Sequence, residues 1–476
     1  MGRDPDRDDA DSRDDVLDGA DAFDGDDAFE GDEVQAGRDE AVAWLDEHTN
    51  YEVSMPTRLR APSLERIREL CRLLGDPERA CPVVHITGTN GKGSTAQILT
   101  RLFMANGLTV GTYTSPNLAV VNERLARDGE PIDDEELTEV LRSLALIETM
   151  MTEHPTRFEL LTAAAFRWFA DTAVDVGVVE VGLGGRWDAT NVVEAEVAVV
   201  TNVSYDHVEV LGPTLADIAA EKSAIIKAGS RVLVGERDPQ LRAIFAAAAE
   251  SVGAAGVWTV DEDFGCERSV VAVGGRMLDL KTPGAVYREM YLPLHGAHQA
   301  ENAAIAVAAA EAFFAAPLSP EVVEAAFGAV TMPCRMEIVR RSPLVVLDGA
   351  HNVAGARALA RGLVEELPTE GETVVVIGML EGRDPRAMID ALVPTGVRTV
   401  VACTAPSPRG IPALSIAEAA RAAGLDAEVV TSTADALARG LNLVPADGRL
   451  VVTGSLYVVA EARPLLVPPT GNLSRR

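Results

Sequence analysis

The 476-residue chain contains very little lysine: its 42 lysine and arginine residues include only four lysines. Its five cysteines are scattered and form no Cys-x-x-Cys pair, which argues against a cysteine zinc site and for a reducing compartment. No apolar run approaches the roughly 20 residues that span a bilayer, and no signal peptide opens the chain. We therefore expect a cytoplasmic protein with no membrane partner.

Acidic residues dominate the charge, and the formal net charge is −31. Residues 1–33 hold 15 acidic residues and three arginines, so we expect residues 1–35 to be a disordered acidic tail. The other 443 residues still carry −19, which fits solubility in high salt, and we expect a halophilic cytoplasm. The alternative is simply an acidic protein with an arginine-rich composition. In either case, so acidic a body argues against nucleic acid as a partner.

The length favours two domains over one. Apolar strands alternate with helical segments, which predicts a parallel sheet covered by helices on both faces. The pattern resets around residues 331–341, so we predict a larger α/β domain over 36–332 and a smaller one over 333–476. The expected helices are 38–48, 63–75, 94–105 and 300–314, and the expected strands are 82–86, 110–113, 174–181, 197–203, 231–234, 257–260, 344–347, 373–377, 399–403 and 450–452.

One of the four lysines, Lys92, lies in a glycine-rich turn between a predicted strand and a predicted helix. Strand, glycine turn and helix form the geometry of a phosphate-binding loop, in which freed backbone N–H groups hold phosphate oxygens and a lysine reaches the outer phosphates. The strict pattern fails, because Ile86 stands where its first glycine belongs and Gly93 follows the lysine. The alternative is an ordinary strand-to-helix loop, but the flanking elements favour a nucleotide site.

Three polar side chains near this loop are candidate metal ligands. Glu180 is a carboxylate in an apolar strand, where desolvation is costly unless it is paired or binds a metal; the alternative is a cap on a loop amide. His207 follows a strand's C-terminal end beside Asp206, where ligands bind in open α/β sheets, although a lone loop histidine is usually a surface residue. Ser115, after another strand, offers a hydroxyl.

Two further lysines, Lys222 and Lys227, lie on an expected helix. Lys222 could donate to phosphate or become a carbamylated, metal-binding anion, and an exposed lysine is the alternative. Lys227 is expected to complement the helix C-terminus. Arg335 lies at the domain seam, and Asp348 and His351 follow the first strand of the second domain. These three could close on a nucleotide bound in the first domain, or each could belong to a surface loop.

Taken together, these motifs resemble the folylpolyglutamate synthase and dihydrofolate synthase family, within the wider Mur ligase superfamily. The resemblance covers about residues 36–460. Its motifs occur in the family's order: Thr-Gly-Thr-Asn-Gly-Lys-Gly-Ser, Thr-Ser-Pro, Phe-Glu-Leu-Leu-Thr, Glu-Val-Gly-Leu-Gly-Gly-Arg-x-Asp-Ala-Thr-Asn, Asp-His, Glu-Lys, His-Gln-x-x-Asn and Asp-Gly-Ala-His-Asn. It implies a phosphate-loop ATPase domain of Mur-ligase type with a parallel-rich central sheet, followed by a smaller Rossmann-like α/β glutamate-ligase domain.

The resemblance also implies site residues. The expected ATP-binding residues are Gly88, Thr89, Asn90, Gly91, Lys92, Gly93, Ser94, Asn302, Arg335 and Asp348. The expected acceptor-binding residues are Thr156, Arg157, Phe158, Glu159, Trp187, Asp188 and Ala189. The expected magnesium ligands are Ser115, Glu180 and His207, and the catalytic residues are Lys92, Lys222 and His351, with Lys222 carbamylated. The sequence departs from the family pattern at Cys334, where glycine is usual, at Val353, where proline is common, and at Trp187, where leucine is common.

By the same resemblance, ATP phosphorylates a substrate carboxylate and the amine of L-glutamate attacks the acyl phosphate, as a step of folate biosynthesis. The carboxylate is that of dihydropteroate or the γ-carboxylate of a reduced folate. The implied requirements are ATP, two Mg²⁺ ions and, as a further candidate, a monovalent cation. We expect small-molecule substrates and a monomer. A Mur-type ligase for another carboxylate acceptor and a nucleotide-binding regulator without ligase chemistry stay open as alternatives.

Overall fold

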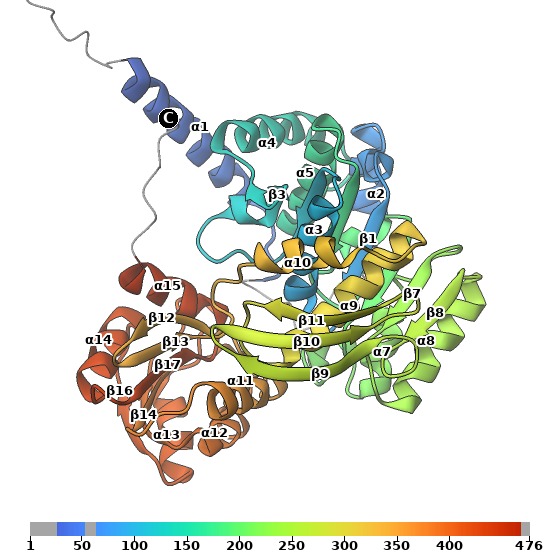
Figure 1. The fold of residues 1–476 in the computed structure, drawn as a ribbon. Coiled ribbons are helices and arrows are strands. Elements are labelled where there is room, and N and C mark those ends of the chain that lie inside the picture. Colours follow the sequence, from blue (N-terminus) through green and yellow to red (C-terminus); the bar gives the residue numbers. More distant parts are fainter. Residues whose placement is uncertain (1–25, 53–62, 468–476) are drawn as a thin grey trace, which may run out of the picture.

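The computed structural model describes residues 26–52 and 63–467, and these residues form two α/β units (Figure 1). Within them the strands make three sheets, two in the first unit and one in the second. The chain passes from one unit to the next between α10 (Pro320–Gly328) and β12 (Glu337–Arg341). Among the described helices, none combines the length and apolar character that a bilayer-spanning segment requires.

The main sheet of the first unit has the strand order β4-β3-β2-β5-β1-β6-β7-β8. Neighbours from β2 through β8 pair in parallel, and β3 and β4 add antiparallel strands at one edge. The central strands are buried along their full length, as expected for strands covered on both faces. The bounds are β1 (Val83–Thr87), β2 (Val110–Tyr113), β3 (Leu125–Arg127), β4 (Glu130–Pro131), β5 (Val176–Glu180), β6 (Val197–Val200), β7 (Arg231–Val234) and β8 (Gly256–Thr259).

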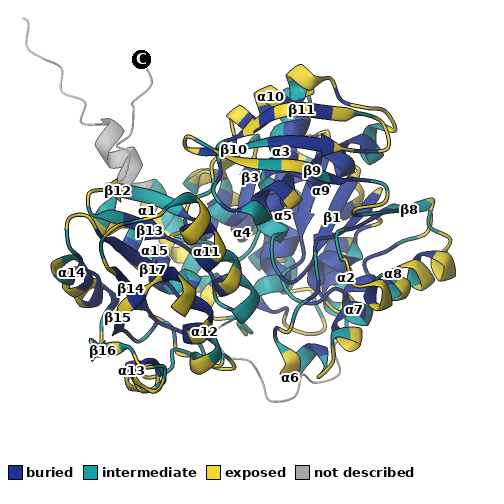
Figure 2. Ribbon diagram, turned by 60° about the horizontal axis from the view of Figure 1, so that its bottom comes forward, coloured by how far each residue is buried: buried dark blue, intermediate teal, exposed yellow. Residues whose placement is uncertain are grey.

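Alternate side chains of this sheet enter different cores. Val84 and Ile86 pack in the core that contains α3 and α9, whereas Val83 packs with α2, α4 and α5. Figure 2 shows the buried sheet enclosed by helices whose outer faces are exposed. The helices of this unit are α1 (Asp26–Asp46), α2 (Glu65–Leu73), α3 (Lys92–Ala105), α4 (Asp134–Glu148), α5 (Arg157–Asp171), α6 (Val208–Leu211), α7 (Leu215–Ser223), α8 (Pro239–Val252), α9 (Ala297–Phe314) and α10.

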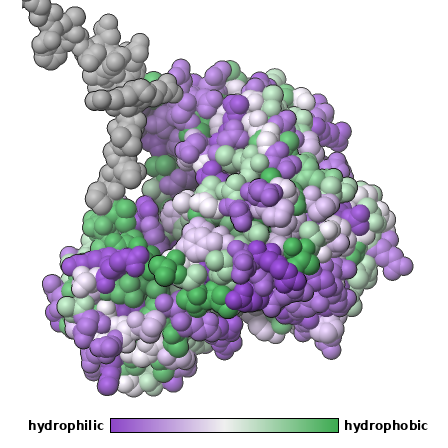
Figure 3. Space-filling model, viewed as in Figure 1, coloured by the Kyte–Doolittle hydropathy of each residue, from purple (hydrophilic) through white to green (hydrophobic). Residues whose placement is uncertain are grey.

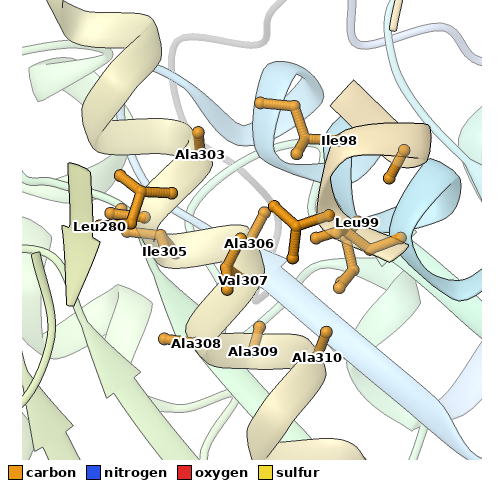
Figure 4. Packing of buried hydrophobic residues seen from close by; sticks show 14 of the residues in the cluster. Ile98, Leu99, Leu280, Ala303, Ile305, Ala306, Val307, Ala308, Ala309 and Ala310 are labelled. Atoms are coloured by element: carbon orange, nitrogen blue, oxygen red, sulfur yellow. The ribbon is translucent and has the colours of Figure 1, made fainter. Parts of the chain in front are cut away.

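An antiparallel sheet of three strands covers α9 on the side away from the main sheet. Its strands are β9 (Gly265–Ala272), β10 (Gly275–Lys281) and β11 (Val286–Leu292), in the order β11-β10-β9. Figure 4 shows α9 passing between Leu280 of this sheet and Ile98 and Leu99 of α3. The small side chains of α9 allow neighbours to approach it closely on several sides, which explains its high alanine content.

The second unit is a six-stranded sheet, in the order β12-β13-β17-β14-β15-β16, parallel except for the β12–β13 pair. Its helices pack on both faces and form two cores. The other elements of this unit are β13 (Leu344–Leu347), α11 (Val353–Glu366), β14 (Thr373–Ile377), α12 (Pro385–Leu392), β15 (Val397–Ala402), α13 (Ala413–Ala422), β16 (Asp426–Val429), α14 (Thr433–Leu443), β17 (Arg449–Thr453) and α15 (Leu456–Leu466). It also contains the short 3₁₀ helix η4 (Val393–Thr395), and the first unit contains η1 (Pro77–Arg79), η2 (Val121–Arg124) and η3 (Ala189–Val192).

The predicted parallel strands are confirmed, and those at 110–113, 231–234, 344–347 and 373–377 have the predicted bounds. The three-stranded sheet, the short strands β3 and β4, and the edge strands β12 and β16 were not predicted. β9 is mostly half-buried or exposed and β11 mixes buried with exposed positions, so they lack the continuous apolar run that identified the parallel strands.

The expected disorder of residues 1–35 is wrong for its last ten residues, because α1 begins at Asp26. Residues 1–25 lie outside the described part of the chain. The helix continues into Ala41 and Leu45, which are buried in the first unit. The acidic composition indicated that the segment forms no core of its own, but it could not exclude a helix extending from a packed segment.

Candidate active site between the two sheets

The candidate residues of the first unit follow the carboxyl ends of its parallel strands. The glycine turn follows β1, residues 182–191 follow β5, and residues 201–207 follow β6. Because β1 lies between β5 and β6, these loops are neighbours at one edge of the sheet. Ligands bind at this edge in open α/β sheets.

The glycine turn presents an uncapped helix N-terminus. Gly91 is the residue before α3 and has a φ of 85°, and no side chain caps the first turn of the helix. The free N–H groups of such a turn are suited to binding phosphate. A Cβ atom at Gly91 would clash with the Oδ1 atom of Asn302, so the turn lies directly against α9.

Asn202, after β6, holds the same turn from the other side. Its backbone carbonyl accepts a hydrogen bond from the N–H of Thr89 (2.9 Å), and its side chain accepts one from the N–H of Asn90 (3.1 Å). The side-chain amide of Asn202 also donates to the carbonyl of Asn90 (2.9 Å). Asn202 was not identified from the sequence as a site residue, although its position directly after a central strand was a usable signal.

Lys92 and Lys222 converge on one acceptor. Their Nζ atoms donate to the carbonyl oxygen of Gly88, at 3.3 Å from Lys92 and 2.8 Å from Lys222. Lys222 is only 3% exposed, so the alternative of an exposed lysine is wrong. Burial and the nearby charge of Lys92 lower the pKa of Lys222 to about 7. Lys227 lies beyond the end of α7, not in its last turn, and donates to the carbonyl of Asn191 (3.2 Å).

Glu180 lies at the end of β5 and is buried. One of its carboxylate oxygens accepts the backbone N–H of Ser115 (3.1 Å), and the other lies 4.0 Å from the Lys92 ammonium. Burial raises the pKa of Glu180, and the charge of Lys92 opposes that rise. The amide cap considered from the sequence is therefore present, and the carboxylate also faces the ammonium of the phosphate loop.

Asp206 and His207 meet residues of the second unit. Arg383, after β14, forms an ion pair with Asp206, and its guanidinium approaches Nε2 of His207 (3.4 Å). Burial would raise the pKa of Asp206, but its contacts with His351, His207 and Arg383 hold the pKa far below the usual range. Burial and the charge of Arg383 lower the pKa of His207 to about 4 against the opposing effect of Asp206, so the ring is neutral at pH 7.

The contact between the two units, which we call the seam, also includes the loop after β13. The side-chain amide of Asn352 donates to Oδ1 of Asn90 and to Oδ2 of Asp206, both at 3.0 Å. The Nε2 atom of His351 lies 3.6 Å from the same Asp206 oxygen. The second unit therefore contacts the phosphate loop directly. Arg383 and Asn352 were missed as site residues, because no local pattern states which loops of two separate sheets will meet.

Arg335 and Asp348 lie near each other behind this seam. Asp348 is buried and accepts the N–H groups of Met336 (2.9 Å) and Ala350 (2.8 Å). Burial raises its pKa, and the charge of Arg335 opposes the rise. Cys334, where the family resemblance implies glycine, has a φ of 60°, a left-handed conformation that favours glycine.

A cavity of about 810 Å³ opens between the carboxyl edges of the two large sheets. Arg157 does not line it; its side chain instead bonds Asp46 (2.7 Å). Leu380, Arg383, Arg409 and residues 454–457 line the cavity from the second unit. The sequence-identified residues that line it are Ser115, Thr156, Phe158, Glu159, Trp187, Asp188, Ala189, His207 and His351.

Ser115, Glu180 and His207 offer a hydroxyl, a carboxylate and an imidazole, of which the first two residues are in contact. Glu180 is a buried carboxylate whose ion pair with Lys92 is long, at 4.0 Å. His207 is neutral, and its Nδ1 atom is buried without a hydrogen-bond partner among the described residues. Residues 26–52 and 63–467 hold no cluster of three His, Cys, Asp or Glu side chains placed for a metal, so a cation bound by these residues would also need a hydroxyl or phosphate oxygen.

The fold and the site define the class of the chain as a Mur-ligase-type protein with an ATPase phosphate loop. Residues 86–310 match the Mur ligase middle domain, and residues 334–456 match the Mur ligase glutamate ligase domain. The structure also resembles a solved Mycobacterium tuberculosis folylpolyglutamate synthase complexed with ADP and AMPPCP. The TM-score is 0.84 at 38% identity, covering 91% of this chain and 99% of the other.

Two curated relatives define the family more narrowly. The Mycobacterium tuberculosis dihydrofolate synthase/folylpolyglutamate synthase is 40% identical over 404 residues, covering 80% of this chain and 82% of the relative. The Lacticaseibacillus casei folylpolyglutamate synthase is 35% identical over 431 residues, covering 88% and 98%. The chain belongs to the dihydrofolate synthase/folylpolyglutamate synthase family.

Proposed function

We propose that the chain is an ATP-dependent ligase that joins L-glutamate to the carboxylate of dihydropteroate, to the γ-carboxylate of a reduced folate, or to both. One observation supports this most strongly: the cavity between the two sheets adjoins an uncapped phosphate loop with two converging ammonium groups. Family membership supplies the reaction class, and the geometry supplies a place for a nucleotide beside a carboxylate acceptor.

The chemistry proceeds in two transfers. A carboxylate oxygen of the acceptor attacks the γ-phosphorus of ATP, ADP leaves, and an acyl phosphate forms. The uncharged amine of L-glutamate then attacks the acyl carbon, inorganic phosphate leaves, and the amine loses a proton as the amide forms. Lys92 and the N–H groups at the start of α3 stabilise the charge that develops on the transferring phosphoryl group.

Ser115, Glu180 and His207 are the residues proposed to hold Mg²⁺. The ion would neutralise phosphate charge and orient the nucleotide. Lys222, once carbamylated, would become a further anionic group beside Gly88. The family resemblance favours two magnesium ions and offers a monovalent cation as an additional ligand of the site.

Water must be kept from the acyl phosphate, because hydrolysis would waste ATP. The seam between Asn352, Asp206 and Arg383 closes the second unit onto the first beside the phosphate loop. Thr156, Phe158, Trp187 and their neighbours form the opposite wall, where we place the acceptor. His351 faces the seam from the second unit, where the incoming glutamate would meet the acyl phosphate.

The assignment is tested with purified protein, ATP and Mg²⁺, by measuring phosphate release in the presence and absence of each remaining substrate. We expect release that requires both L-glutamate and an acceptor, either 7,8-dihydropteroate or tetrahydrofolate. Absence of release with both acceptors would contradict the assignment. Release that requires a different carboxylate acceptor would instead identify another Mur-type ligase.

We further propose a monomer that works in a halophilic cytoplasm, with small molecules as its only ligands. Hydrophilic residues cover wide areas of the visible face, between hydrophobic patches (Figure 3), and the formal charge of the whole chain is −31. Salt screens the repulsion within such a body. The unfolding midpoint should therefore rise between low and molar KCl, and a fall would contradict the halophilic assignment.

A further inference from the structure

Arg409 reaches the cavity from the second unit, in the loop that follows β15. Its guanidinium donates to the backbone carbonyl of Glu52 in the first unit (3.4 Å). Its own carbonyl accepts the N–H of Glu381 (2.8 Å), and the next residue, Gly410, bridges to Leu380. The backbone of this loop is therefore fixed while the side chain crosses the seam.

The other arginines of the cavity are already paired with carboxylates. Arg66 pairs with Glu159 (3.1 Å), and Arg383 pairs with Asp206. Arg409 has no ion pair among the described residues.

Arg409 contacts the backbone carbonyl of Glu52 but not its side-chain carboxylate. That carboxylate accepts two hydrogen bonds from Arg124 instead, at 2.9 and 2.6 Å. Residues 53–62, which follow Glu52, contain no Asp or Glu. The guanidinium of Arg409 thus keeps a charge that the described protein does not neutralise, inside the cavity where the proposed function places anionic substrates.

Arg383 and Arg409 lie toward different ends of the cavity. Arg383 contacts Asp206 and His207, next to the phosphate loop. Arg409 contacts Glu52, in the segment whose Thr49 carbonyl accepts the N–H of Arg157, at the start of α5. Arg409 therefore lies on the acceptor side of the cavity, beside the segment that precedes α5.

The two candidate acceptors, dihydropteroate and a reduced folate, differ in the number of carboxylates at their reacting end. Dihydropteroate has one carboxylate, which is the group that reacts. A reduced folate presents its γ-carboxylate for reaction and keeps an unreacted α-carboxylate beside it. A guanidinium binds such a carboxylate with two parallel N–H···O bonds. We infer that Arg409 binds the unreacted carboxylate of folate acceptors and so sets the preference of the enzyme between folates and dihydropteroate. This inference rests on the proposed function.

The test compares Arg409→Gln, which removes the charge, with Arg409→Lys, which keeps it, and with Arg398→Gln as a matched control. Arg398 is exposed on β15 of the same unit. The readout is the ratio of kcat/KM for tetrahydrofolate to kcat/KM for 7,8-dihydropteroate, at saturating ATP, Mg²⁺ and L-glutamate. We expect Arg409→Gln to lower this ratio roughly tenfold through a higher KM for tetrahydrofolate, because one charged contact is lost. Arg409→Lys should restore part of the ratio, and Arg398→Gln should leave it unchanged.

Equal losses with both acceptors, or a raised KM for L-glutamate instead, would overturn the inference. Calorimetric binding of the two acceptors without L-glutamate separates this failure from a failure of the proposed function. If Arg409→Gln weakens the binding of tetrahydrofolate but not that of 7,8-dihydropteroate, the inference stands even without ligation. If wild type and Arg409→Gln bind tetrahydrofolate equally, the inference is wrong whatever reaction the protein catalyses.

Discussion

Lys92, at the start of α3, and Lys222, near the end of α7, donate to the same carbonyl oxygen of Gly88. Burial disfavours the charged form of Lys222, and the nearby charge of Lys92 adds to this effect, so the pKa of Lys222 falls to about 7. Arginine could not take this role, because it stays charged. A lysine with this pKa is partly uncharged at neutral pH, and the uncharged amine is the form that adds CO₂ to give a carbamate and a proton.

Carbamylation of Lys222 should therefore depend on pH with a definite sign. As pH falls below about 7, the ammonium form of Lys222 increases and the carbamate should be lost. Raising the pH from 6 to 8 in bicarbonate should increase a ¹³C-carbamate NMR signal that Lys222→Arg abolishes. Lys281→Arg, at an exposed site, is the control and should leave the signal intact. A signal that persists in Lys222→Arg would assign the modification elsewhere.

Individual site residues could be identified from the sequence where a polar or charged side chain stood in an unusual local setting. Glu180 was identifiable as a carboxylate inside an apolar strand, and Lys222 as a rare lysine on a predicted helix. Arg383 and Asn352 gave no comparable signal, because their partners, Asp206 and Asn90, lie in another sheet more than a hundred residues away. Such long-range pairing depends on how the two units dock, which short sequence patterns do not encode.

At the scale of the element, α11 joins two contacts with the first unit. Its N-cap residue, Asn352, accepts the N–H of Gly355 (2.9 Å) through its side-chain oxygen and uses its side-chain NH₂ group to contact Asn90 and Asp206. Its last residue, Glu366, is paired with Arg276 of β10. One helix of 14 residues, about 21 Å long, thus connects the phosphate loop to the far side of the interface.

Substitutions of Asn352 should separate helix capping from seam formation. Asn352→Ser keeps a capping oxygen but removes the NH₂ donor, so stability should stay close to wild type while kcat falls roughly tenfold through a misplaced second unit. Asn352→Ala removes both functions and should lose about 1 kcal/mol of unfolding free energy in addition. Urea denaturation and steady-state kinetics measure the two effects. Equal kcat values for Asn352→Ser and wild type would show that the seam contact has no catalytic importance.

Strands and helices could be predicted where several consecutive residues shared the same pattern of burial. The strands β2, β7 and β13 are short apolar runs between turns, and the sequence gives their bounds directly. β9 and β11 carry many exposed residues, and their stability depends on packing against α9 and α10. That dependence on partners distant in sequence is why the three-stranded sheet was missed.

At the scale of the whole molecule, Glu366 forms a charged anchor between the units. Its carboxylate accepts hydrogen bonds from Arg276 and from the N–H of Gly296 (2.8 Å), and it lies 3.0 Å from Nδ1 of His295. The Glu366 side chain is fully buried and that of Arg276 is 5% exposed. Burial would raise the pKa of Glu366, but these contacts lower it below the usual value, so the anchor is ionised at neutral pH.

Loss of this anchor should affect both stability and turnover. Glu366→Gln leaves Arg276 buried without its counter-charge and should reduce the free energy of unfolding by about 3 kcal/mol. Glu365→Gln, one residue earlier and exposed, is the matched control and should change it little. Because a carboxylate with a lowered pKa stabilises the fold only when ionised, the difference between wild type and Glu366→Gln should shrink as the pH falls into the acidic range. A difference that is constant with pH would contradict this role.

The general plan of two α/β units with a reset near residue 335 was predictable, because strand and helix patterns restart there. The orientation of the units was not, since it depends on single contacts such as those of Asn352 and Glu366. The central claim is that these contacts enclose an acyl-phosphate reaction.

The most direct measurement of that claim follows oxygen from the acceptor to phosphate. Dihydropteroate labelled with ¹⁸O in its carboxylate is incubated with the enzyme, ATP, Mg²⁺ and L-glutamate, and the released phosphate is analysed by mass spectrometry. If the carboxylate attacks the γ-phosphorus and phosphate later leaves the acyl carbon, one carboxylate oxygen departs with the phosphate. Each released phosphate should therefore contain one ¹⁸O atom. Acceptor-dependent phosphate without ¹⁸O would contradict the account.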